Sequence, residues 1–388
     1  MQIRWICVHT ESKKNNGFKP KILRIERIIT FQELKLIENE WRGFYSQNGI
    51  VSPFLTFEFI NLWYECFSEP EDVRIYKVFN GSGAIGFLPV VIEKIGSLRI
   101  LKSLTNDHCL HSGPLVKNGY EEVFSKIILE EILKDWKLWD VFCYRFSYSF
   151  SQFPGLFSDE LLNNMNVIGE RREQPTYAIS LNKSYEEYFR KDLSLNSRKN
   201  FMRILNRLKT AGNYRMVECR GIEGLNRWDD FIKLEDSGWK GEKHSSIKKV
   251  SQSYQKYYSN LVKLLADKDA LDMYFLELNG LPIAGVFGYF EGDIYHWAKI
   301  GYDERHKDFS PSNLLILFII ENIIKKYPGV KMFHMFPWDY NYKHRYTNTT
   351  ATCFETIIYS STKRGRLIHA FDKLKGNMRK IIRPLVNG

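Results

Sequence analysis

The sequence lacks the short motifs that identify several common classes of enzyme. It has no Walker A loop, no GxGxxG that follows a first strand and opens a helix, no GxSxG and no HExxH. Each of these motifs places groups that its chemistry requires, such as phosphate-binding N–H groups or zinc-binding histidines. Their absence argues against nucleotide hydrolysis, hydride transfer, serine hydrolysis and zinc proteolysis.

Cysteine is scarce, and its six copies stand far apart without CxxC spacing. Disulfide frameworks and structural zinc sites need cysteines in closer or more regular groups. The spacing therefore argues against both and fits reduced thiols in a cytoplasmic protein. We expect no bound metal.

The sequence also has no apolar run long enough to cross a membrane. The longest predicted apolar helix, residues 314–324, has about eleven residues, whereas a membrane-spanning helix needs roughly twenty. The first ten residues resemble a strand and lack the apolar core of a signal peptide. We expect a soluble, cytoplasmic protein with no membrane span.

The composition is that of a folded, basic protein. Hydrophobic residues make up 44% of the chain and aromatic residues 15%, which is typical of globular domains. A length of 388 residues predicts two or three domains of about 150 residues each. The net charge of +11 favours an anionic partner such as a nucleotide or coenzyme phosphates, although an ordinary basic protein has the same charge.

Both halves of the chain predict helices mixed with short, mostly antiparallel strands. A loop-rich stretch at residues 149–166 separates the halves. We therefore predict two lobes, residues 1–165 and residues 166–388. The predicted fold class is mixed α/β, with a largely antiparallel sheet flanked by helices in each lobe.

The second half supplies the frame of the candidate site. Tight turns at Asn279-Gly280 and Glu291-Gly292 are typical of hairpins and predict a three-stranded antiparallel meander. The predicted strands are residues 176–181, 214–219, 270–278, 282–290, 293–302 and 330–336, and the predicted helices are residues 195–211, 225–237 and 252–266.

A tight turn, Ser310-Pro311-Ser312-Asn313, follows the meander and predicts a phosphate site. Pro311 suits the first position of a helix, and Ser310 suits the N-cap. The N–H groups of a helix start lack intrahelical partners and carry partial positive charge, so they bind anions. A capped helix that binds nothing explains the same residues, but its position between two strands favours a ligand site.

Two other groups in the second half suggest chemistry. Trp239-Lys240-Gly241 follows a predicted helix that carries Glu235, and a loop of this composition suits an anionic or sugar ligand. His334, Asp339, Tyr342 and Lys343 come at and after the next predicted strand. A histidine, aspartate or tyrosine there is suited to take a proton from an attacking amine. The plainer interpretation of Trp239-Lys240-Gly241 is the end of a helix with a packed tryptophan. The plainer interpretation of the His334 group is a polar strand end with aromatic packing.

The first half contributes a polar loop with Asp107 and His108. In a two-lobed protein this loop could face the cleft and bind the acceptor, although a histidine in a loop is more often a surface residue. Basic segments at residues 188–209 and 363–383 could bind phosphates or an acidic surface, or could simply be solvated.

At these residues the chain resembles the double-GNAT acyltransferases, which include FemAB-like ligases and CelD-like acetyltransferases of polysaccharide synthesis. The resemblance spans most of the chain. Where this family usually has glycine after its Ser-Pro pair, the chain has Ser312-Asn313. The motifs that carry the resemblance are Ser52-Pro53-Phe54, Gly86-Phe87-Leu88-Pro89, Arg198-Lys199-Asn200, Trp239-Lys240-Gly241, Ser310-Pro311 and Tyr342-Lys343.

The resemblance implies transfer of an acyl group from acyl-CoA to an amine, with the coenzyme between splayed central strands. It implies cofactor contacts from Ile300, Tyr302, Ser310, Ser312 and Asn313, with a backbone N–H near Ile300 or Tyr302 as the oxyanion donor. The implied proton acceptors are His334, Asp339, Tyr342 and His108. The implied acceptor-binding residues are Asp107, Glu235, Trp239, Lys240 and Lys343.

Three hypotheses remain open on the sequence alone. The first is N-acylation of a nucleotide-linked amino sugar in surface-polysaccharide (O-antigen or capsule) synthesis, with no nucleic-acid partner. The second is a FemAB-like ligase that uses aminoacyl-tRNA on a cell-wall precursor, for which the segment between Trp239 and Ala270 has room for one helix and not a long hairpin arm. The third is a non-catalytic protein that binds an anionic polymer.

Overall fold

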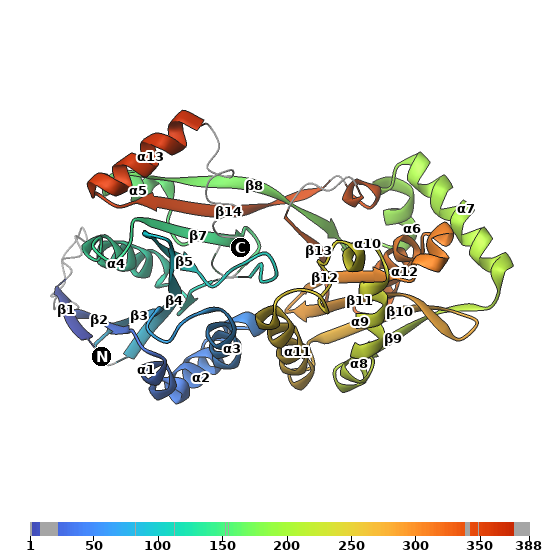
Figure 1. The fold of residues 1–388 in the computed structure, drawn as a ribbon, viewed down its shortest axis with the longest axis horizontal. Coiled ribbons are helices and arrows are strands. Elements are labelled where there is room, and N and C mark those ends of the chain that lie inside the picture. Colours follow the sequence, from blue (N-terminus) through green and yellow to red (C-terminus); the bar gives the residue numbers. More distant parts are fainter. Residues whose placement is uncertain are drawn as a thin grey trace, which may run out of the picture. The chain divides into compact units, whose positions relative to one another are not determined.

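The computed structural model describes residues 2–7, 22–81, 83–111, 113–151, 153, 155–337, 342–347 and 349–375. Their contacts define two units (Figure 1). The first unit contains Met1–Ile50, Phe54–Gln174 and Thr352–Gly388, and the second contains Val51–Pro53 and Pro175–Ala351.

The observed division differs from the predicted boundary near residue 165. The boundary falls inside strand β8 (Gly169–Ser180), and the segment after residue 351 belongs to the first unit. The reason is strand pairing, because β14 (Thr350–Tyr359) runs antiparallel to β7 (Val141–Tyr148) of the first unit.

The first unit is a mixed sheet whose core packs against helix α4 (Glu121–Lys134). Its strands follow the order β1-β2-β3-β4-β5-β7-β14, and only β5 and β7 are parallel among the described pairs. The other elements are β1 (Gln2–Cys7), β2 (Ile22–Ile28), β3 (Val73–Asn80), β4 (Gly83–Ile95), β5 (Leu98–Ser103), β6 (Leu115–Val116), α1 (Phe31–Leu36), α2 (Glu38–Gln47), α3 (Phe57–Phe67), α5 (Asp159–Asn164) and α13 (Lys363–Lys375).

The second unit is also a mixed, largely antiparallel sheet, as predicted. Its strand order is β8-β13-β12-β11-β10-β9, and β12 and β13 form its parallel pair. The tight turn Asn279-Gly280 has positive φ at both residues, 52° and 81°, as a two-residue hairpin requires. Its strands are β9 (Tyr214–Arg220), β10 (Leu271–Leu278), β11 (Leu281–Glu291), β12 (Ile294–Tyr302) and β13 (Met332–Pro337).

Helices cover this sheet, and α12 (Pro311–Lys326) supplies much of its apolar core. Leu315, Ile316 and Ile319 of α12 have no exposed surface, and burial of each contributes about 1.5–3 kcal/mol. Helix α9 lies across β11 and β12 (Figure 1). The other helices are α6 (Tyr185–Glu187), α7 (Leu195–Ala211), α8 (Ile222–Asn226), α9 (Trp228–Ser237), α10 (Trp239–Glu242) and α11 (Gln252–Asp267).

Local signals explain where these helices begin and end. Ser194 caps α7, because its Oγ accepts a hydrogen bond from the Ser197 N–H at 3.1 Å, and Gly212 ends the helix, as predicted. The predicted loop at Trp239 is instead the single helical turn α10. Within the part of the chain that the structure describes, no helix is long and apolar enough to cross a membrane.

Candidate functional site

The central feature of the second unit is a splay between its two parallel strands. β12 and β13 pair from Ile294 with Met332 to His296 with His334, and no later pair forms between their described residues. Beyond that point β12 continues alongside β11 to Tyr302, and β13 continues alongside β8 to Pro337. The gap therefore opens toward the carboxyl ends of both strands, where ligands of α/β sheets commonly bind.

A β-bulge bends β12 where the splay begins. The register with β11 pairs Phe287 with Lys299 and Gly288 with Trp297, so Ala298 has no partner in that register. A bulge increases the local bend and twist of a strand. It therefore helps to direct β12 away from β13.

Two lysines, the partly buried Lys240 and the buried Lys343, donate hydrogen bonds to backbone carbonyls of the two separated strands. Lys240 Nζ donates to the Ile300 carbonyl of β12 at 2.8 Å. Lys343 Nζ donates to the Phe336 and Pro337 carbonyls of β13, both at 2.8 Å. Carbonyls of separated strands need other partners. The sequence predicts both lysines as acceptor-binding residues. In the structure their ammonium groups instead donate hydrogen bonds to backbone carbonyls of the separated strands.

Glu235 lies between two ammonium groups beneath β12. Its Oε1 is 3.4 Å from Lys240 Nζ and 3.8 Å from Lys299 Nζ, and its Oε2 accepts from the Ile247 N–H. Burial lowers the pKa of Lys240. Burial, and then the charge of Lys240, lower the pKa of Lys299 to about 8. One carboxylate between two lysines leaves this partly buried cluster with a net positive charge when both lysines are protonated.

Two glycines explain how closely this cluster approaches the sheet. A Cβ on Gly301 would lie 2.4 Å from the Glu235 backbone nitrogen, so α9 can pack on β12 only where the strand has no side chain. A Cβ on Gly241 would lie 1.9 Å from the Asp236 carbonyl oxygen, so the turn that aims Lys240 requires glycine there. The side chain of Trp239 lies outside the described part of the structure.

The start of α12 brings together the three residues of the predicted phosphate site. Pro311 occupies the first helical position and Ser310 the N-cap, as predicted. Ser310 makes no side-chain capping bond, however, because it adopts the left-handed conformation with φ 43°. Ser312 Oγ is buried and has no hydrogen-bond partner among the described residues. Asn313 Oδ1 accepts from Tyr346 Oη at 3.0 Å, which fixes its orientation.

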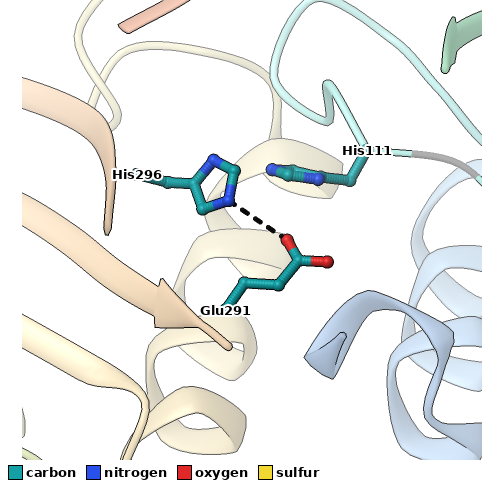
Figure 2. Close-up of side chains that lie close together, drawn as sticks. All are labelled: His111, Glu291 and His296. Atoms are coloured by element: carbon teal, nitrogen blue, oxygen red, sulfur yellow. Dashed lines mark ion pairs between the residues drawn. The ribbon is translucent and has the colours of Figure 1, made fainter. Parts of the chain in front are cut away.

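His334, a predicted base, belongs to a hydrogen-bonded chain of three side chains, with Thr176 and His296. Its Nε2 lies 2.6 Å from Thr176 Oγ1, and its Nδ1 lies 3.0 Å from His296 Nδ1. His296 Nε2 is 3.2 Å from Glu291 Oε2, and Figure 2 shows this carboxylate directed at the ring. Sequence reasoning missed Thr176, His296 and Glu291, because only the parallel register of β12 and β13 places the two histidines side by side.

The other predicted residues lie at different places. Tyr342 is 40% exposed, and its ring packs edge-on against Trp297 at 5.9 Å. Asp339 lies outside the described residues. Ile300 and Tyr302 are on the splayed part of β12. Asp107 and His108 belong to the first unit, where the His108 N–H donates to Asn106 Oδ1.

Comparison with known proteins gives a family match and a fold. Residues 196–344 match the family described as an acetyltransferase (GNAT) domain. FemX is 11% identical, with 89% of this chain and 100% of that chain covered and a TM-score of 0.54. The C-terminal domain of a putative lysylphosphatidylglycerol synthetase from Agrobacterium fabrum is 11% identical, with 86% and 96% covered and a TM-score of 0.50. No curated protein matches the chain.

Proposed function

We propose that this chain is an N-acyltransferase of the GNAT type with two GNAT-like lobes, and that it transfers an acyl group from acyl-CoA to the amine of a nucleotide-linked amino sugar. The observation that carries the donor half is the splay of β12 and β13 next to the start of α12. The setting of the reaction would be surface-polysaccharide synthesis.

The donor would lie along the splayed part of β12. The coenzyme pyrophosphate would lie at the start of α12 and accept a hydrogen bond from Ser312 Oγ, which has no described partner. The Asn313 and Leu314 N–H groups already donate to the Ser310 carbonyl, so Ser312 is the donor that the helix start offers. The pantetheine would follow the backbone of β12. The Ile300 carbonyl already accepts a hydrogen bond from Lys240, so it is not available to the pantetheine. Backbone N–H groups near Ile300 or Tyr302 would donate to the pantetheine and to the oxyanion.

The acceptor would be anionic. The partly buried cluster of Glu235, Lys240 and Lys299 is positive when both lysines are protonated, and Lys343 adds another cation at the end of β13. Positive charge near a splay attracts a diphosphate and raises its encounter rate. The overall charge of +11 supports two polyanionic substrates.

A thiol-release assay tests this reaction. Purified protein is incubated with acyl-CoAs of several chain lengths and a panel of nucleotide-linked amino sugars, and free coenzyme A is measured. We expect release that depends on both substrates, together with calorimetric binding of coenzyme A. If no acceptor on the panel supports release and calorimetry detects no binding of coenzyme A, the proposal is refuted.

A second candidate is aminoacyl transfer from charged tRNA to a cell-wall precursor, which the similarity in fold to FemX favours. The segment between Trp239 and Ala270 contains α10 and one further helix, α11, with no helical hairpin, as the sequence predicts. Incorporation of a labelled amino acid from charged tRNA into a cell-wall precursor, without release of coenzyme A from any acyl-CoA, would favour this alternative.

A further inference from the structure

Helix α13 of the first unit presents apolar side chains to solvent instead of to the core. Leu367, Phe371 and Leu374 are 59%, 58% and 83% exposed. Their spacing of four and then three residues places them on one stripe of the helix. A surface helix of a globular protein normally has the opposite orientation, with its apolar stripe against the core. An exposed apolar stripe of this kind marks a surface that binds another molecule.

Polar contacts on the opposite face of α13 fix this orientation. Asp372 is buried, and its Oδ2 accepts hydrogen bonds from Tyr359 Oη at 2.7 Å and Arg172 Nη2 at 3.1 Å. A Cβ on Gly365 would lie 2.3 Å from the Ser360 carbonyl oxygen, so the helix packs closely where β14 ends (Figure 1). The helix cannot turn its apolar stripe inward without breaking these contacts.

Basic side chains border the apolar stripe. Lys363, Arg366 and Lys373 are exposed, whereas Asp372, the one acidic residue of the helix, is on its buried face. At 3.6 residues per turn, Arg366 and Lys373 lie along one side of the stripe, and Lys363 precedes it by one turn. Apolar residues bordered by cations are typical of helices that lie in a membrane interface. The long stems of lysine and arginine let their charges reach lipid headgroups.

Charge argues against two other occupants of the stripe. The sequence after the helix, residues 376–388, carries Arg379, Lys380 and Arg383 and no acidic residue. If this segment covered the stripe, it would add cations to a face that is already basic. The same helix of a second copy in a symmetric pair would do so as well. Like charges brought together in this way repel, whereas an anionic surface neutralises them.

We propose that α13 binds the surface of an anionic phospholipid membrane. The helix lies in the plane of the interface, with Leu367, Phe371 and Leu374 among the acyl chains and the basic side chains at the headgroups. Apolar burial and attraction to anionic lipid both contribute to such binding. The attachment is reversible and needs no spanning segment. It is independent of the reaction that the chain catalyses, so it stands or falls separately from the proposed acyl transfer.

Sedimentation with lipid vesicles tests the proposal on the full chain. The protein is mixed with vesicles of phosphatidylcholine alone, or of phosphatidylcholine with phosphatidylglycerol, at low and at physiological salt. We expect binding to the vesicles that contain phosphatidylglycerol and not to the others, and weaker binding at the higher salt concentration, because salt screens the charges. Binding to neither kind of vesicle, or equal binding to both, overturns the proposal.

Variants of the apolar stripe test its part in binding. The triple change Leu367→Ser, Phe371→Ser and Leu374→Ser should lower vesicle affinity at least about 100-fold, because it removes most of the apolar area that enters the lipid. Leu36→Ser, at a position 82% exposed on α1 of the same unit, is the control and should bind as the wild type does. All four positions are exposed, so thermal melting should show an unchanged Tm. Wild-type affinity in the triple variant contradicts the proposal.

Variants of the basic border test the electrostatic part. The double change Arg366→Gln and Lys373→Gln should weaken binding about 25-fold, or about 5-fold for each charge removed. The control, Lys126→Gln with Lys233→Gln, removes the same net charge at exposed positions of α4 and α9 and should retain wild-type affinity. Equal loss in the two double variants shows adsorption through net charge alone and overturns the proposal.

An environment-sensitive fluorophore distinguishes insertion from adsorption and from self-association. The cysteine side chains that the structure describes are buried, so a nitrobenzoxadiazole label should select the new thiol of Leu374→Cys. We expect its emission to rise with anionic vesicles, and the same label on Leu36→Cys to show no change. Vesicle binding without this rise contradicts insertion. A wild-type dimer that the triple serine variant disrupts, with no vesicle binding, shows that a second copy covers the stripe instead.

Discussion

At the residue scale, Asp272 shows how burial shapes stability. This carboxyl lies on β10 with no exposed surface, and burial, followed by the charge of Glu218, raises its pKa well above the usual value. An unfolded chain releases the proton near pH 4, about the ordinary value for aspartate. The folded chain therefore binds more protons above that pH, and the free energy of unfolding falls as the pH rises toward the raised pKa.

We therefore expect Asp272→Asn to raise the Tm at pH 8 and to flatten the dependence of Tm on pH between 5 and 8. The gain should be on the order of 1–3 kcal/mol, because the neutral amide does not carry the cost of a buried charge. Scanning calorimetry at several pH values measures both effects. Asp267→Asn on the exposed surface of α11 is the matched control and should change neither. A lower Tm at pH 8 for Asp272→Asn would contradict this account.

Lys240 gives a second prediction at this scale. Lys240→Met leaves the Ile300 carbonyl without its donor and Glu235 with one cation fewer. The free energy of unfolding should fall by about 1–3 kcal/mol, the usual cost of an unsatisfied buried polar group. Urea denaturation measures the change. Lys233→Met, whose side chain is 78% exposed on the same helix α9 that carries Glu235, should be near neutral. Equal stability of the two variants would show that Lys240 does not support the splay.

At the scale of elements, the sequence predicted most strands and helices because their signals are local. The Asn279-Gly280 turn, the Ser194 cap and the Gly212 stop depend on a few neighbouring residues. The helical periodicity of residues 31–45 predicts one helix, whereas the structure has two helices, α1 and α2, that meet at Ile37. The strand β2 was missed, because its pairing with β1 and β3 is a long-range contact.

The splay itself depends on long-range contacts that no local pattern contains. The positions of Lys240 and Lys343 on strand carbonyls, and the pairing of His296 with His334, require the parallel register of β12 and β13. The sequence could therefore predict the residue types of the site and the helix start at Pro311. It could not predict which side chains contact one another.

The start of α12 carries a prediction about this element. Ser312→Asp places a carboxylate at the helix N-terminus, which favours the helix but repels a pyrophosphate. We expect calorimetry to show affinity for coenzyme A at least about 10-fold weaker, with the Tm unchanged or higher. Thr30→Asp, at the N-cap of α1 in the first unit, adds the same charge at another helix start and should leave affinity unchanged. Equal affinity in both variants would refute the placement of the pyrophosphate.

At the scale of the whole molecule, the loop-rich stretch at residues 149–166 suggested a boundary that the contacts place elsewhere. Strands β8 and β14 each contribute residues to both units, so no single loop separates the units. Loop composition marks exposed segments but cannot show that a late strand pairs with an early one. The two-lobed, mixed α/β organisation was nevertheless predictable, because each half of the sequence carries its own strands and helices.

The central claim is that this chain transfers an acyl group from acyl-CoA to an amine. Thiol release from acyl-CoA in the presence of nucleotide-linked amino sugars tests it most directly. The account predicts release by the wild type with at least one acceptor, together with calorimetric binding of coenzyme A. No release from any acyl-CoA with any acceptor, in protein that does not bind coenzyme A, would contradict it.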